Sequence, residues 1–155
     1  MSRLHLILAA LLATALVAVG CGDSGPSATE TYKAAFTPLN AEVISTGNDV
    51  GQAVQTANTK TDSQIAVDFT RLSDSAAALA GQLVKLEPPK DLEADNTALI
   101  KGLRLMSGKL NRIADAAVQG DAAAAKTATT EMVQASTGIR DPRRRIAEAL
   151  KLESP

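Results

Sequence analysis

Side chains able to do nucleophilic or metal chemistry are scarce in this chain. Its single cysteine and single histidine are Cys21 and His5, so both lie among the first 21 of 155 residues. The remainder of the chain can therefore hold no Ser-His-Asp relay and no histidine-ligated zinc, di-iron or haem site. Its glycines are scattered singly, without a phosphate-binding loop. We expect no catalysis, no metal and no cofactor.

Paired carboxylates could act as acid and base, or bind a hard cation. With about 100° of rotation per residue along a helix, Glu42, Asp49 and Asp115 fall well away from the apolar positions around them. We expect these three side chains in solvent. Asp68 is expected to pair with Arg71 about one turn further along, as a surface ion pair.

Two polar residues, Thr46 and Asn96, fall on otherwise apolar helix faces. A buried hydroxyl or amide at such a place can fix the register of a helix through local hydrogen bonds, or it can contact a ligand. Simple exposure near a helix end is a third possibility. We expect register or local hydrogen bonding, and ligand contact is the alternative.

Basic residues gather in two places. Four of them share the face opposite a leucine stripe, which is typical of a solvated surface: Lys101, Arg104, Lys109 and Arg112. Four arginines near the C-terminus form the densest basic cluster: Arg140, Arg143, Arg144 and Arg145. This cluster is either a solvated face or a contact with anionic headgroups or an anionic envelope polymer.

Nucleic-acid binding is not expected. It needs aromatic side chains over a basic groove, whereas aromatic residues make up only 2% of the chain and the net charge is −1.

The elements that position these residues all show helical periodicity. From Thr29 onward, apolar residues recur at spacings of three and four, and no stretch alternates with period two. Two capping-box pairs, Ser27 with Glu30 and Thr61 with Gln64, mark the starts of helices. We expect four helices, at about 29–58, 62–87, 89–119 and 121–152.

Prolines and one glycine mark the breaks between these helices. The Pro-Pro pair at 88–89 separates the second helix from the third, and Gly120 suits the left-handed cap that ends the third. Pro38 is expected to kink the first helix, the alternative being a helix that restarts there. Pro142 is expected to bend or split the fourth helix near 138–142.

Helices of this length, joined by such short connections, lie antiparallel to their neighbours in known bundles. We therefore expect an all-α fold, an up-down-up-down antiparallel four-helix bundle over residues 29–155, present as a monomer. Its core of Ala, Leu, Val and Ile is expected to leave little room for a large internal ligand.

The N-terminus has the pattern of a secretory signal. A positively charged start precedes an apolar run over 4–19, and Gly20 stands directly before Cys21. These residues resemble a bacterial lipoprotein signal. The resemblance implies that residues 1–20 are a signal peptide, that the Cys21 thiol is acylated, and that the protein is anchored on the extracytoplasmic face of the cell membrane. Ordinary secretion, an uncleaved anchor and a structural cysteine are the alternatives. Residues 21–28 read as a flexible tether.

A second resemblance concerns the region between the expected second and third helices. Residues 86–110 read LEPPKDLEADNTALIKGLRLMSGKL and are similar to the Pro-Pro hairpin of small Ala-rich helical lipoproteins of actinobacterial type. Such proteins are largely without an assigned function, so the resemblance bears on fold and location.

For function, we expect a non-catalytic, lipid-anchored interaction or cell-envelope-associated module. Its partners would be the membrane, through Cys21, and an envelope protein or anionic envelope polymer. The alternative is a small-ligand-binding lipoprotein accessory to a transporter or sensor. An apolar cavity between helices, with a few converging polar groups, would favour that alternative.

Overall fold

The structure is a computed structural model that describes residues 26–152, and this part of the chain is built from helices joined by short connections. The expected all-α class is confirmed, with no strand among residues 26–152. Their order is α1 (Ala28–Thr56), the short 3-10 helix η1 (Ala57–Thr59), α2 (Asp62–Leu83), α3 (Glu93–Gln119), α4 (Ala122–Ala135) and α5 (Thr137–Ala149). The predicted signal peptide and Cys21 lie outside the described residues. Within 26–152, none of the helices has the length and apolarity that a membrane span requires.

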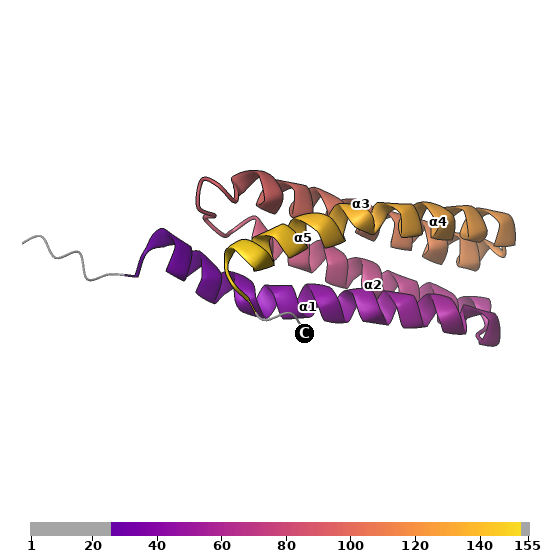
Figure 1. The fold of residues 1–155 in the computed structure, drawn as a ribbon. Coiled ribbons are helices and arrows are strands. Elements are labelled where there is room, and N and C mark those ends of the chain that lie inside the picture. Colours follow the sequence, from indigo (N-terminus) through magenta and orange to yellow (C-terminus); the bar gives the residue numbers. More distant parts are fainter. Residues whose placement is uncertain (1–25, 153–155) are drawn as a thin grey trace, which may run out of the picture.

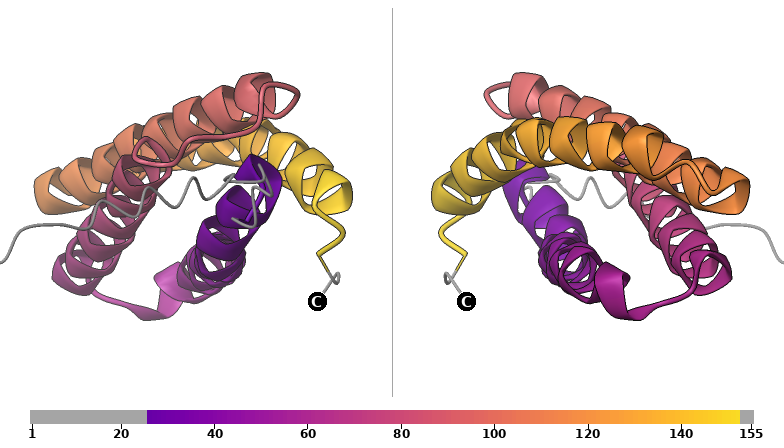
Figure 2. Two further views of the ribbon diagram at one scale, coloured as in Figure 1. Left: turned by 90° about the vertical axis from the view of Figure 1, so that its left-hand side faces the viewer. Right: turned by 90° about the vertical axis from the view of Figure 1, so that its right-hand side faces the viewer.

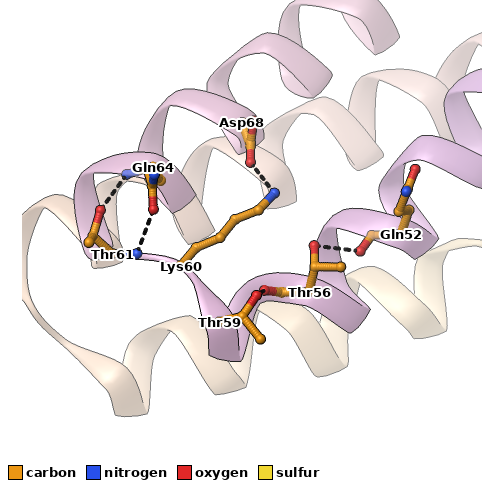
Figure 3. A network of polar contacts seen from close by, with 7 residues as sticks. All are labelled: Gln52, Thr56, Thr59, Lys60, Thr61, Gln64 and Asp68. Atoms are coloured by element: carbon orange, nitrogen blue, oxygen red, sulfur yellow. Dashed lines mark hydrogen bonds and ion pairs between the residues drawn. The ribbon is translucent and has the colours of Figure 1, made fainter.

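Both predicted capping boxes are present. The Ser27 hydroxyl accepts the Glu30 amide and the Glu30 carboxylate accepts the Ser27 amide, at 3.2 and 2.7 Å. These bonds satisfy amides that have no partner within the helix, and they lower the pKa of the Glu30 carboxyl. Thr61 and Gln64 make the same reciprocal pair at the start of α2, as Figure 3 shows.

Pro38 lies inside α1, and the helix is continuous across it, so the helix does not restart there. The hydroxyl of the preceding Thr37 donates to the Lys33 carbonyl at 2.7 Å, which adds a bond next to the one that proline cannot make. The first turns of α1 are tilted relative to the rest of the helix (Figure 1).

The connection between α1 and α2 corrects one expected ion pair. Asp68 pairs with Lys60, which lies just after η1, and not with Arg71 (Figure 3). The chain turns back at η1, and this turn carries the Lys60 ammonium over the first turns of α2. A contact across a turn depends on the path of the chain, which helical spacing alone does not contain.

The connection around the Pro-Pro pair is longer than expected. α2 ends at Leu83 instead of 87, and α3 begins at Glu93 instead of 89. Because Pro88 and Pro89 have no amide hydrogen, the carbonyls of residues 84 and 85 have no helical partner four residues ahead. Helix α2 therefore ends before residues 84 and 85.

The fourth expected helix is divided in two. The division falls at Ser136, between α4 and α5, and not near 138–142, since α5 continues through Pro142. Ser136 keeps helical angles, with φ −61° and ψ −30°, so α4 and α5 follow one another along a single curved path (Figure 1). At the other end of α4, Gly120 takes the expected left-handed conformation, φ 65°, and Asp121 caps the helix by accepting the Ala124 amide at 2.9 Å.

The apolar stripes meet in two core clusters. One surrounds the stacked rings of Tyr32 and Phe36 and includes Ile146 and Leu150 from the C-terminal end of the chain. The other surrounds Phe69 and includes Met132. Viewed from either end, α1 and α2 lie on one side and α3, α4 and α5 on the other (Figure 2). α3 packs against α2, α4 and α5, whereas α1 packs mainly against α2.

Candidate ligand-binding cavity

Asn96 is buried, as its place on an apolar face predicts, and it bonds to α1. Its amide oxygen accepts a hydrogen bond from the Tyr32 hydroxyl at 3.0 Å. Burial, together with the nearby Asp95 carboxylate, raises the pKa of Tyr32 to about 12. The pair joins α1 to α3 inside the core, and because it links residues 64 positions apart it suits a role in helix register rather than local hydrogen bonding.

Two of the four clustered arginines connect α5 to other helices. Arg143 donates to the amide oxygen of Asn40 on α1 at 3.0 Å, and the Arg145 guanidinium lies 2.7 Å from the Asp95 carboxylate on α3. Asn40 is only 7% exposed, so Arg143 supplies the donor for a buried acceptor. The bond to Asp95 also raises the pKa of Arg145.

The other two arginines of the cluster stay near the surface. Arg144 lies 3.3 Å from Glu148 one turn on, and Arg140 lies 3.9 Å from Asp141. The side chains of Arg140 and Arg144 are 68% and 59% exposed. The cluster is thus interleaved with carboxylates rather than presented as one block of free positive charge.

Two of the basic residues on the predicted solvated face of α3 reach across to α4. Lys109 and Arg112 both pair with Glu131, and the hydrogen bond from Lys109 is the main reason that the pKa of Glu131 is lowered. Lys101 and Arg104 are exposed. This face therefore serves partly to position α4 along α3.

An apolar cavity of about 350 Å³, partly open to solvent, lies between the helices. It lies where α1 runs past α4 and the start of α5, and α2 and α3 close its floor. Its lining is Thr46, Gly47, Val50, Gly51, Val54, Gln55, Ala76, Leu103, Met106, Met132, Val133, Ser136 and Ile139.

Two glycines help to keep this space open. Gly47 and Gly51 are one turn apart on α1, and a methyl group added at either would meet nothing within 4 Å. The opposite wall carries Met106 and Met132, whose flexible side chains adapt easily to the shape of a bound molecule. The cavity can therefore accept a guest without displacing backbone.

The lining determines what such a guest could be. None of the lining residues is charged and none is aromatic, and the polar ones are Thr46, Gln55 and Ser136. The Ser136 hydroxyl donates to the Val133 carbonyl at 2.7 Å, so its oxygen is left as an acceptor. An ion placed here would find no countercharge, whereas an uncharged apolar molecule would exchange water for hydrocarbon.

The sequence-predicted site residues are thus separated. Thr46 is half-buried and lines the cavity, while Asn96 and the four arginines lie outside its lining. Gly51 and Met132, which also line the cavity, were not expected as site residues. The only hint of the cavity in the sequence is a pair of glycines four residues apart in a helix, but the sequence does not show which helix faces them.

Other hollows on the described residues are less suited to binding a small molecule. One of them, about 650 Å³, is a shallow depression on α2 alone. Among the described residues, no three His, Cys, Asp or Glu side chains come together in a way that could hold a metal ion.

Comparison of the chain with models of protein families, with curated proteins and with solved structures finds no match.

Proposed function

We propose that this protein is a lipid-anchored helical module on the extracytoplasmic face of a bacterial cell membrane, and that it binds a small uncharged molecule between its helices without catalysing a reaction. The observation that carries the ligand-binding part is the cavity of about 350 Å³, which falls in the size range of small-molecule sites. Its mostly apolar wall with three polar groups is the usual composition of such sites.

The anchor part of the proposal rests on the sequence. A lipid on Cys21 would be joined to the start of α1 at Ala28 by seven residues, at most about 23 Å of extended chain. We further propose that the helices form an up-down-up-down antiparallel bundle, in which α4 and α5 together act as the fourth helix, and that the protein is a monomer. The start of α1 would then face the membrane.

An interaction module, in contact with an envelope protein, an anionic polymer or headgroups, is the second candidate. The exposed guanidinium groups of Arg140 and Arg144 favour it. However, the Arg143 contact brings this part of α5 beside Asn40, about 18 Å along α1 from Ala28. That is more than two Debye lengths at physiological salt, so we favour ligand binding over contact with headgroups.

Calorimetric titration of residues 22–155 with two uncharged probes, 1-octanol and toluene, tests the ligand-binding part. We expect saturable binding of at least one probe with a negative heat-capacity change, because apolar surface leaves water. Gly51→Leu fills part of the cavity and should weaken binding at least tenfold.

Gly81→Leu is the matched control. Gly81 lies on α2, outside the cavity lining, and an added side chain there also meets nothing within 4 Å. Absence of saturable binding of both probes, or equal binding by the two leucine variants, would refute ligand binding in this cavity.

A further inference from the structure

We infer that the cavity takes one aliphatic chain of limited length that carries an uncharged hydroxyl or carbonyl group at one end. This inference rests on the proposed function and specifies its ligand. It excludes the anionic, cationic and polypeptide classes of occupant.

Polypeptide is excluded by size. A single α-helical turn about 10 Å across and 5.4 Å tall occupies about 420 Å³. The cavity, at about 350 Å³, is smaller than that turn, so it cannot enclose a helix of a partner or of a second copy. The occupant is a small molecule.

The length of the occupant follows from volume and from the spacing of the lining. At about 30 Å³ per non-hydrogen atom with its hydrogens, close to the volume of a water molecule, 350 Å³ holds about 12 such atoms. Thr46 and Gln55 are nine residues apart on α1, which is about 13 Å of helix. An extended chain of 12 atoms, at about 1.2 Å per bond, is also about 13 Å long. Volume and span thus agree.

The polar group of the ligand belongs near Thr46. Asn40 and Arg143 are in contact, and from there Thr46 lies six residues along α1 and Ser136 seven residues back along α5. These steps cover about 9 and 10.5 Å along the chain, and both residues line the cavity. Figure 1 shows α1 and α5 running in opposite directions along the molecule. The Thr46 hydroxyl can donate or accept, and the Ser136 oxygen can accept, which suits an alcohol.

The test uses the full chain in lipid nanodiscs and a photoactivatable analogue of 1-decanol, with labelled peptides mapped by mass spectrometry. We expect labelling of the cavity-lining segments of α1 and α4 in the wild type. Unlabelled 1-alkanols of 6 to 14 carbons then compete, and their free aqueous concentrations are measured by dialysis. The half-inhibiting concentration should fall about fourfold per added methylene and level off near 11 carbons.

Two further measurements test whether the ligand must be uncharged and whether it binds in this cavity. Decanoate and decyltrimethylammonium should compete at least tenfold less well than 1-decanol, because their charge finds no partner. Gly51→Leu adds four carbon atoms to the wall and should move the levelling-off point to about 7 carbons. Gly81→Leu should leave it unchanged.

The outcomes separate the two proposals. If the cavity segments are not labelled in the wild type, this inference fails, and the calorimetric titration with toluene then decides whether ligand binding in the cavity fails with it. If labelling is present, equal competition by the charged compounds, affinity that still rises at 14 carbons, or no shift in Gly51→Leu would overturn the inference while ligand binding stands.

Discussion

Replacement of Gly102 by alanine should destabilise the protein, although alanine favours helices over glycine. Gly102 is buried in α3 and faces the first turn of α5. A methyl group built on it would lie 2.5 Å from the Gly138 carbonyl oxygen and 2.9 Å from a side-chain carbon of Ile139. Both separations are well inside van der Waals contact.

The carbonyl in this contact cannot move aside as a side chain would. In an uninterrupted helix, the Gly138 carbonyl would accept the amide of residue 142, but residue 142 is Pro and has no amide hydrogen. The oxygen instead occupies the space where a side chain at residue 102 would begin, so only glycine, which has no Cβ, fits there. An added methyl group must push α5 away from α3. The same shift would stretch the bond between Arg145 on α5 and Asp95 on α3.

The expected magnitude is a difference between two opposing effects. Overpacking a buried site costs about 1 to 3 kcal/mol, and exchange of glycine for alanine within a helix returns about 0.5 to 1 kcal/mol. We therefore expect Gly102→Ala to lower the free energy of unfolding by about 1 kcal/mol.

Gly108 provides the matched control. It lies on the same helix, is exposed, and has nothing within 4 Å of an added methyl group. Gly108→Ala should raise the free energy of unfolding by about 0.5 to 1 kcal/mol. Both variants gain the same helix propensity, so the gap between them measures the overpacking alone.

Urea unfolding of residues 22–155, followed by far-ultraviolet circular dichroism, gives both values. The wild type also shows in this experiment whether the segment folds by itself as a helical protein. Equal stability of Gly102→Ala and Gly108→Ala would refute the reasoning, because it would mean that α5 does not approach α3 at Gly138.

Three other predictions concern the contacts between helices and the anchor. Folding raises the pKa of Tyr32 from 10.0 to about 12, so the unfolded chain loses its phenolic proton first and stability falls as the pH rises from 10 to 12, by up to about 3 kcal/mol. Urea midpoints across this range should show the loss in wild type and not in Tyr32→Phe. Arg143→Ala leaves a buried amide oxygen on α1 without its donor and should cost about 1 to 2 kcal/mol in the same unfolding assay, whereas Arg144→Ala, which removes an exposed pair, should change stability by less than about 0.5 kcal/mol. Metabolic labelling with a fatty-acid analogue should mark the wild type and not Cys21→Ser, and equal labelling of both would exclude acylation at this residue.

Local features of this fold could be predicted from the sequence. The capping boxes at Ser27 and Thr61 and the left-handed cap at Gly120 occur as expected, because each depends on residues only a few positions apart. The apolar faces were also predictable, since helical spacing puts residues three and four apart on one side. Asn96 is buried for the same reason.

Only the tertiary structure decided which residues meet across helices. Asp68 finds Lys60 rather than Arg71, and Arg145 finds Asp95 fifty positions away, because partners on different helices depend on register and on the path of the connections. The cavity beside Gly51 has the same origin. A glycine has no side chain to fill the space beside its helix, but a cavity results only if the neighbouring helix does not pack into that space. Beside Gly51, α4 leaves the space open, whereas at Gly102 the start of α5 packs directly against the glycine. The same residue type thus marks an opening on α1 and a close contact on α3, and the packing of whole helices determines which.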